Sequence, residues 1–299
     1  MKIGIFGFGA VGASIYNELH DYKDLYILMD GNRKEKYKDG ITINGKNYNP
    51  NIITNGIMDL VIVSVKNYSL EEALPSLKNF IDTSTIILPL LNGITARDVI
   101  LKYYPNNNVL YGLIFVESNK DGLNVETSKI INICFGEKNN EVIKDYLLEI
   151  KNIFDKYNVN NEICKNMLAK QYSKWMLNLG INQISALCNA TYKDMSHPLI
   201  KEVLYQIFGE VYEVSKAYNV GMSDDDYNKI KERCEHFTSN RVTSLTMDFN
   251  NNDRNELDAF SYTLLKLAKE KNIKCPVNEL LYKLLKAKDD NNKRKRASL

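Results

Sequence analysis

Three glycines near the start of the chain restrict its fold more than any other feature. Gly7, Gly9 and Gly12 lie in the run GFGAVG, directly after the apolar run KIGIF and directly before the amphipathic run AVGASIYNELHDY. In a strand–turn–helix unit, Gly7 permits the tight turn, Gly9 lets the backbone approach a pyrophosphate, and Gly12 lets the helix pack on the strand. The helix N-terminus then offers N–H groups to phosphates. The alternative is a glycine-rich turn without a ligand. The predicted cofactor-binding residues of this turn are Gly7, Phe8, Gly9, Ala10, Val11 and Gly12.

The first half of the chain alternates apolar runs with amphipathic ones. The runs DLVIVSV and TIILPLL are continuously apolar, which is typical of strands buried on both faces of a parallel sheet. This alternation predicts an α/β fold with a Rossmann-type doubly wound parallel sheet. Strands are expected over residues 2–6, 25–29, 59–65, 85–91, 108–116 and 129–136, a hairpin-like insertion over 41–52, and a helix over 139–157.

Helical periodicity replaces this alternation in the second half. With 299 residues, the chain is longer than one typical domain. We expect a dinucleotide-binding domain over residues 1–165 and an all-α domain for substrate binding and catalysis over residues 166–299. Its polar, basic end, residues 289–299, is expected to be disordered.

The charge balance and the cysteine content indicate which partners the protein has and in which cellular compartment it is expected. Thirty-nine Lys and Arg against 37 Asp and Glu call for neither a nucleic-acid nor a membrane partner. No apolar run reaches the about 18 residues of a transmembrane helix. The five scattered cysteines lack metal-ligand spacing, so we expect reduced thiols, a cytoplasmic protein and no metal site.

The cofactor preference is ambiguous from the sequence. Asp30 ends the second predicted strand, where an acidic residue accepts hydrogen bonds from the ribose hydroxyls and repels a 2′-phosphate. This favours NAD. Arg33 and Lys34 follow closely and offer a clamp for a 2′-phosphate, unless both cations are only solvated.

Two polar positions follow buried strands directly. Lys66 follows DLVIVSV, and Asn92 with Gly93 follows TIILPLL. Ligands in open α/β sheets bind at the carboxyl ends of the strands, so we expect both positions to line one edge with Gly7 and Asp30. Taken singly, each also fits an ordinary loop lysine or an Asn-Gly turn.

A polar stripe marks the first long helix of the second half. Lys174, Asn178 and Asn182 recur every four residues within QYSKWMLNLGINQISALCN, and apolar side chains cover most of the remaining circumference. A helix of this kind is buried. Burying an ammonium and two amides without partners is costly, so the stripe should face a polar cavity or a ligand. Alternatively, Lys174 extends to solvent and the amides bond neighbouring backbone.

A second polar cluster lies in SLTMDFNNNDRNELDAF. Ser244 and Asp248 are four residues apart on one predicted helix. A new helix is expected near Asp253, and Asp253 and Glu256 have the spacing of a capping box. Capping alone would account for this second pair.

Together these motifs resemble the ketopantoate reductase (2-dehydropantoate 2-reductase) family over nearly the whole chain. The resemblance implies a Rossmann domain followed by a helical domain, and NADPH-dependent reduction of 2-dehydropantoate to pantoate in pantothenate biosynthesis. It implies that Lys174 is the general acid, and that Glu256 hydrogen-bonds the substrate hydroxyl and positions the lysine. The other implied roles are substrate binding for Asn178, Asn182 and Ser244, proximity to nicotinamide and substrate for Asn92, and a place in the cofactor-side cleft for Lys66.

The chain departs from the family pattern at several positions. Asp30 stands where a basic residue is usual, which leaves NADH open beside NADPH. Leu91 replaces a common Gln, Tyr172 a frequent Trp, and Ser261 with Tyr262 a common Asn-Gly pair. A reductase of a different branched 2-oxo acid is therefore the main alternative, a non-catalytic dinucleotide sensor is a remote one, and a homodimer stays open.

Overall fold

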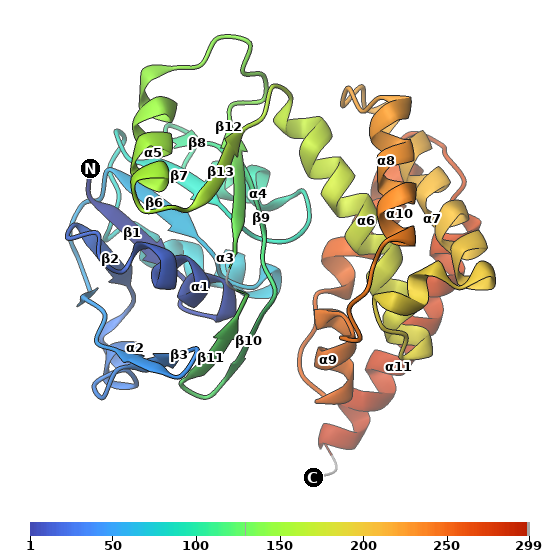
Figure 1. Ribbon diagram of the computed structural model, residues 1–299, viewed down its shortest axis with the longest axis horizontal. Helices are drawn as coiled ribbons and strands as arrows, with labels where there is room; N and C mark the ends of the chain where they lie inside the picture. Colours follow the sequence, from blue (N-terminus) through green and yellow to red (C-terminus); the bar gives the residue numbers. More distant parts are fainter. Residues whose placement is uncertain (129, 298–299) are drawn as a thin grey trace. The chain divides into compact units, whose positions relative to one another are not determined.

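The computed structural model describes residues 1–128 and 130–297. The chain divides into two compact units, Met1–Met167 and Leu168–Leu299 (Figure 1).

A six-stranded parallel sheet forms the centre of the first unit. Its strand order is β5-β2-β1-β6-β7-β8, and every pair of neighbours is parallel. All residues of β1, β6 and β7 are buried. The predicted parallel sheet is confirmed. Its strands are β1 Ile3–Phe6, β2 Leu25–Leu28, β5 Ile52–Ile53, β6 Leu60–Val63, β7 Ile86–Pro89 and β8 Asn108–Val109.

Helices cover both faces of this sheet, which makes it doubly wound (Figure 1). In β6, Leu60 and Ile62 join one core cluster while Val61 and Val63 join the other, because successive side chains of a strand point to opposite faces. Helices α1 and α5 pack in the first cluster, and α3 and α4 in the second. The helices of this unit are α1 Ala10–Leu19, α2 Gly31–Glu35, α3 Asn67–Leu77, α4 Ala96–Tyr103 and α5 Asp145–Lys156.

Two smaller sheets complete the first unit. One has the order β10-β11-β3-β4 and contains the expected hairpin of residues 41–52, which turns at Asn44 and Gly45, both with positive φ. The other has the order β13-β12-β9. The strands are β3 Ile41–Ile43, β4 Lys46–Tyr48, β9 Tyr111–Phe115, β10 Ser118–Asp121, β11 Asn124–Thr127, β12 Asn132–Gly136 and β13 Asn160–Ile163.

Three details of the first unit differ from the sequence predictions. The single strand expected over 108–116 is divided at Leu110, because β8 pairs with β7 whereas β9 pairs with β12. The helix expected from residue 139 begins only at Asp145, since the Asn140 side chain ties this segment to Glu137 and to the carbonyl of Cys164. Strands β10, β11 and β13 were not predicted.

The second unit is helical, as predicted. Helix α6 runs through its core: Trp175, Met176 and Leu179 are almost fully buried, as expected for a helix that is apolar nearly all round. Its elements are α6 Met167–Cys188, a 3₁₀ turn Lys193–Ser196, α7 Pro198–Ala217, α8 Asp224–Glu235, α9 Ser244–Asn250, a π-helical segment Asp258–Tyr262, α10 Thr263–Glu270 and α11 Pro276–Ala297.

The prediction of a disordered tail from residue 289 is wrong as far as Ala297, where α11 ends. Asp289 is buried, accepts a hydrogen bond from Asn255 (2.8 Å) and forms an ion pair with Lys293 (2.6 Å). The amide of Asn292 donates to the carbonyl of Phe249 (3.1 Å). Tertiary partners thus hold a segment whose own composition gives no hydrophobic reason to order. Residues 298–299 lie outside the described part of the chain.

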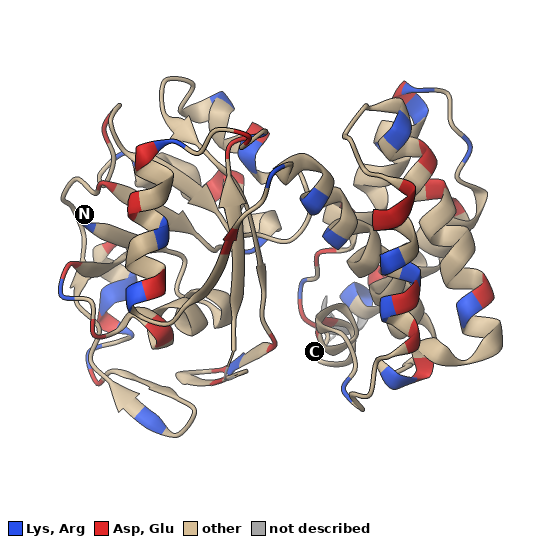
Figure 2. Cartoon of the chain, turned by 45° about the horizontal axis from the view of Figure 1, so that its top comes forward, with Lys and Arg blue, Asp and Glu red and all other residues tan. Residues whose placement is uncertain are grey.

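Charged residues of both signs are interspersed over the chain, as its small net charge suggests (Figure 2). Several form exposed ion pairs, such as Lys201 with Glu235 (2.9 Å) and Lys151 with Asp155 (2.9 Å). Pairs of this kind contribute little to stability. Among the described residues, no helix is both long enough and apolar enough to span a bilayer.

Candidate active site

The glycine turn has the geometry that a dinucleotide site needs. Gly7 adopts φ +105°, and a Cβ there would lie 2.7 Å from the backbone nitrogen of Val65. A Cβ at Gly12 would collide with the carbonyl oxygen of Gly7 and lie 2.8 Å from Ser64 Oγ. At Gly9, by contrast, no described atom lies within 4 Å of the Cβ position. The Cβ positions of Gly7 and Gly12 are therefore blocked by neighbouring atoms, whereas the space beside Gly9 is open.

The N-terminus of α1 at this turn suits an anion. Gly9 is the N-cap residue, no described side chain caps the helix, and the first turn contains no acidic residue. Unpaired N–H groups and the positive end of the helix dipole favour a phosphate here. The residues present therefore fit the pyrophosphate of a nicotinamide dinucleotide.

The polar positions expected to share an edge follow four adjacent strands of the sheet. Asp30, Gly7, Lys66 and Asn92 come after β2, β1, β6 and β7. Asn67 Nδ2 donates to the carbonyl of Asn92 (2.9 Å), so the loops after β6 and β7 are joined.

A serine that sequence reasoning missed ties the glycine turn to its neighbour. Ser64 Oγ donates to the carbonyl of Gly7 (2.7 Å), which joins the loops after β1 and β6. Nothing in the local sequence marks Ser64 for this role, because its partner is 57 residues away.

Asp30 and Arg33 interact directly with each other. Asp30 is the N-cap of α2: its side chain accepts a hydrogen bond from the backbone N–H of Arg33 (2.8 Å) and lies 3.5 Å from Arg33 Nε. Both side chains are more than half exposed. The acidic and basic signals for cofactor choice thus belong to one exposed pair beside the glycine turn.

The polar stripe of the second unit lies on α6. Lys174 and Asn178 are half-buried and Asn182 is buried, while Trp175, Met176 and other apolar side chains surround them. The helix therefore carries these three polar side chains at i, i+4 and i+8, and it also buries the polar side chains of Gln183 and Ser185. The helix is buried, as predicted, and the roles of Lys174, Asn178 and Asn182 stay predictions.

A buried hydroxyl network positions Ser244 relative to this helix. Ser185 on α6 lies 2.7 Å from the hydroxyl of Thr246, and Thr243 lies 3.0 Å from the same hydroxyl. Thr243 is the N-cap of α9, and Ser244 is the first residue of that helix. The network fixes the start of α9 against α6, so Ser244 is held by the same element that carries Lys174.

Glu256 does not form the expected capping box. Helical structure resumes at Leu257, after an irregular segment, and the side chain of Asn255 accepts a hydrogen bond from the N–H of Leu257 (3.1 Å). Glu256 instead precedes the helix and is buried. Leu257 packs in one cluster with Ala186 of α6 and residues of α9 and α11. The three elements that carry Lys174, Ser244 and Glu256 therefore share one core.

Comparison with known proteins identifies the family. Residues 3–140 match the family model described as ketopantoate reductase PanE/ApbA, and residues 166–289 match that of its C-terminal domain. This chain belongs to the ketopantoate reductase family. It is a nicotinamide-dependent oxidoreductase, as the sequence analysis expected.

Curated relatives agree with this assignment at low identity. A 2-dehydropantoate 2-reductase of Pyrococcus horikoshii is 26% identical over 308 residues, covering 97% of this chain and 98% of its own. A 2-dehydropantoate 2-reductase of Aquifex aeolicus is 24% identical over 240 residues, covering 78% of this chain and 77% of its own.

Solved structures show the same fold. The ternary structure of D-mandelate dehydrogenase with NADH and anilino(oxo)acetate matches with a TM-score of 0.89 at 20% identity, covering 98% of this chain and 100% of that one. A ketopantoate reductase from Staphylococcus aureus, described as dimeric, matches with a TM-score of 0.83 at 20% identity and the same coverage.

Three of the departures from the family pattern, Leu91, Tyr172 and Ser261, are buried, whereas Tyr262 is exposed. Leu91 belongs to a core cluster of the first unit, and Tyr172 packs edge-on against Trp175 (5.5 Å between ring centroids). The indole N–H of Trp175 has no hydrogen-bond partner in the described part of the chain. Ser261 is fully buried within the π-helical segment. Such segments occur often at functional sites.

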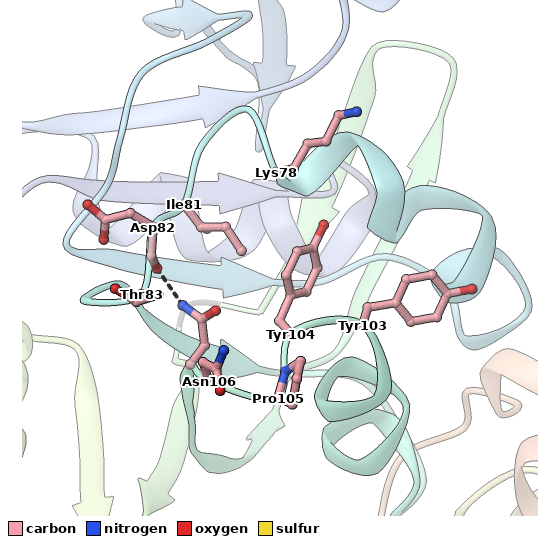
Figure 3. A pocket seen from close by; sticks show the side chains of 9 residues that line it. Lys78, Ile81, Asp82, Thr83, Tyr103, Tyr104, Pro105 and Asn106 are labelled. Atoms are coloured by element: carbon pink, nitrogen blue, oxygen red, sulfur yellow. Dashed lines mark hydrogen bonds between the residues drawn. The ribbon is translucent and has the colours of Figure 1, made fainter.

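One pocket of the first unit lies away from the glycine turn (Figure 3). Its residues precede β7 and β8, so it opens at the amino ends of these strands, whereas Lys66 and Asn92 follow the carboxyl ends. Asn107 Nδ2 donates to the carbonyl of Asp82 (2.6 Å), so a hydrogen bond joins the segments that precede β8 and β7. The pocket is not part of the cofactor edge. Its lining residues are Lys78, Ile81, Asp82, Thr83, Tyr103, Tyr104, Pro105, Asn106 and Asn107.

Two buried thiols meet a carboxylate in the first unit. The ligand atoms of Cys134, Glu162 and Cys164 lie within 4.8 Å of one another, although no metal site was expected from cysteine spacing. Cys134 Sγ is 3.8 Å from a Glu162 oxygen across neighbouring strands. Structural zinc sites take four ligands, so this group of three falls short of one.

Proposed function

We propose that this chain reduces 2-dehydropantoate to pantoate, with Lys174 as the general acid. The observation that carries the proposal is the Lys174–Asn178–Asn182 stripe on a buried helix of a chain that belongs to the ketopantoate reductase family. A 2-oxo acid has carbonyl and carboxylate groups, which can accept hydrogen bonds from an ammonium and from two side-chain amides.

The residues divide the reaction between them. A bound nicotinamide supplies a hydride to the carbonyl carbon of the substrate. Negative charge then develops on the carbonyl oxygen, where the Lys174 ammonium stabilises it and donates a proton to form the hydroxyl. Asn178, Asn182 and Ser244 orient the 2-oxo acid, and their contribution is positioning. Glu256 hydrogen-bonds the substrate hydroxyl, positions the lysine and favours its charged form.

The cofactor is bound by the first unit in this proposal. The open space above Gly9 and the uncapped N-terminus of α1 support pyrophosphate binding at the turn. Members of the family use NADPH, and we propose it as the reductant. The exposed Asp30–Arg33 pair favours NADH as the second candidate, because a carboxylate at this place repels a 2′-phosphate.

Substrate specificity is tested with initial rates. NADPH and NADH oxidation should be followed with 2-dehydropantoate, with other branched 2-oxo acids and with an aryl 2-oxo acid. We expect the highest kcat/KM with 2-dehydropantoate. A higher value with another 2-oxo acid would instead favour the alternative function, the reduction of a different 2-oxo acid. The fold shared with D-mandelate dehydrogenase supports this alternative. No oxidation with any substrate, in a protein that binds cofactor, would contradict both.

Removing the charge of Asp30 is expected to shift the cofactor preference toward NADPH. Asp30→Asn keeps the N-cap of α2 but frees Arg33 from its carboxylate, so the Kd ratio of NADPH to NADH should fall about tenfold. Asp30→Ala should shift the ratio similarly and also lose about 1 kcal/mol of stability with the cap. Dissociation constants from nicotinamide fluorescence check this. If the Kd ratio of NADPH to NADH in both variants equals that of the wild type, Asp30 does not select the cofactor.

A further inference from the structure

A lysine from the unpredicted β10–β11 hairpin contacts the glycine turn. Lys120 lies on β10, and its Nζ donates hydrogen bonds to the carbonyl of Phe8 (2.6 Å) and to the hydroxyl of Tyr37 (2.9 Å). The Tyr37 hydroxyl also donates to the Phe8 carbonyl (3.2 Å). The ammonium lies 4.9 Å from the ring centroid of Tyr37 and 5.5 Å from that of Phe8. One cation thus joins the turn after β1 to the segment after β2.

This ammonium has no acidic partner in the described part of the chain. Among residues 1–128 and 130–297, no carboxylate oxygen lies within 4.0 Å of Lys120 Nζ. Burial, together with a smaller effect of the nearby cation Lys36, lowers the pKa of Lys120 to about 8. Keeping an uncompensated cation half-buried is unfavourable, so its position beside a phosphate-binding turn calls for an anion.

We propose that Lys120 belongs to the cofactor site, where its ammonium fixes the carbonyl of the glycine turn and supplies positive charge to the phosphates of the adenosine half of the dinucleotide. The inference rests on the cofactor binding proposed above. Phe8 lies between Gly7 and Gly9, and Tyr37 follows α2, which Asp30 caps. Lys120 therefore touches both the pyrophosphate side and the ribose side of the predicted cofactor edge.

The surrounding groups set the direction of the pH effect. Lys36 and Tyr37, which follow α2, lie near Lys120, and Arg33 acts on Tyr37. Tyr16 on α1 packs against Phe8, and the apolar Val125 is the partner of Lys120 on β11. A bound phosphate would favour the charged lysine, so binding takes up a proton. Cofactor affinity should therefore fall as the pH rises through about 8, the value in the free protein.

The test compares NADPH and NADH binding to the full-length wild type, Lys120→Met and Lys120→Arg between about pH 6.5 and about pH 9.5. At pH 7, Lys120→Met should bind about tenfold more weakly and lose the pH dependence. Lys120→Arg should keep the affinity but also lose the dependence, because a guanidinium stays protonated. Lys78→Met, an exposed lysine at the opposite edge of the sheet, is the matched control and should behave as wild type.

The two cofactors distinguish which phosphate is involved. An equal loss for NADH and NADPH in Lys120→Met assigns the charge to the pyrophosphate, and a larger loss for NADPH assigns it to the 2′-phosphate. Unchanged affinity in folded Lys120→Met overturns the inference, as does weaker binding with a flat wild-type pH profile, which indicates a purely structural role. If the wild type binds neither cofactor at any pH, the proposed function itself fails.

Discussion

Replacing Lys174 by alanine should lower kcat by about two to four orders of magnitude, which is the usual contribution of a general acid. The variant should bind NADPH or NADH as tightly as the wild type, because the proposed cofactor residues lie in the first unit and Lys174 lies on α6 of the second. Steady-state rates with a 2-oxo acid and fluorescence titration of the cofactor measure the two effects separately.

Two further variants make this result specific. Lys174→Arg keeps a positive charge near the developing alkoxide but holds its proton too tightly to donate it, so we expect a large but smaller loss of turnover. Lys266→Ala removes an exposed lysine on α10 and should have no effect. Near-normal turnover of folded Lys174→Ala would remove Lys174 from the mechanism, whatever the other two variants show.

Alanine substitutions at Gly12 and Gly9 should separate folding from cofactor binding. At Gly12 a Cβ collides with the Gly7 carbonyl, so Gly12→Ala should destabilise the protein by about 1–3 kcal/mol and abolish tight NAD(P)H binding. At Gly9 the Cβ position is open and φ is −81°, so the free energy of unfolding should change by less than about 1 kcal/mol.

Cofactor binding by Gly9→Ala tests the proposed phosphate site more directly than binding by Gly12→Ala, because Gly9→Ala should keep normal stability. Its methyl group occupies the space that the proposal assigns to the pyrophosphate, and we expect cofactor affinity to fall more than about tenfold in a protein of normal stability. Chemical denaturation and cofactor titration of the same preparations provide both measurements. Wild-type affinity in Gly9→Ala would show that the open space above the turn is not the phosphate site.

The glycine turn was predictable because its constraints are local. The positive φ at Gly7 and the close approach of Gly12 to the Gly7 carbonyl are set within the turn and appear directly in the spacing of GFGAVG, although both glycines also pack against Ser64 or Val65 after β6. The stripe on α6 was predictable for a related reason, since the period of the helix places Lys174, Asn178 and Asn182 on one face wherever the helix packs.

The failed predictions share a different cause. The capping box at Asp253 and Glu256 has the correct spacing, yet helical structure begins at Leu257 because that residue packs with Ala186, Leu245 and Leu285. The tail was expected to be disordered, yet α11 continues to Ala297. Within this segment, Asp289 and Asn292 form hydrogen bonds with residues of other elements. Local spacing and composition carry no information about such partners.

From the sequence alone follow the parallel sheet, the glycine turn at its first strand, the helical second half and the resemblance that names the family. These depend on backbone conformation and hydrophobic period, which act over a few residues. Only the tertiary structure joins Ser64 to Gly7 and Lys120 to Phe8, 57 and 112 residues apart. Such contacts form because the sheet order and the β10–β11 hairpin bring together side chains that are far apart in the sequence. No motif or local spacing in the sequence indicates which distant residues will meet.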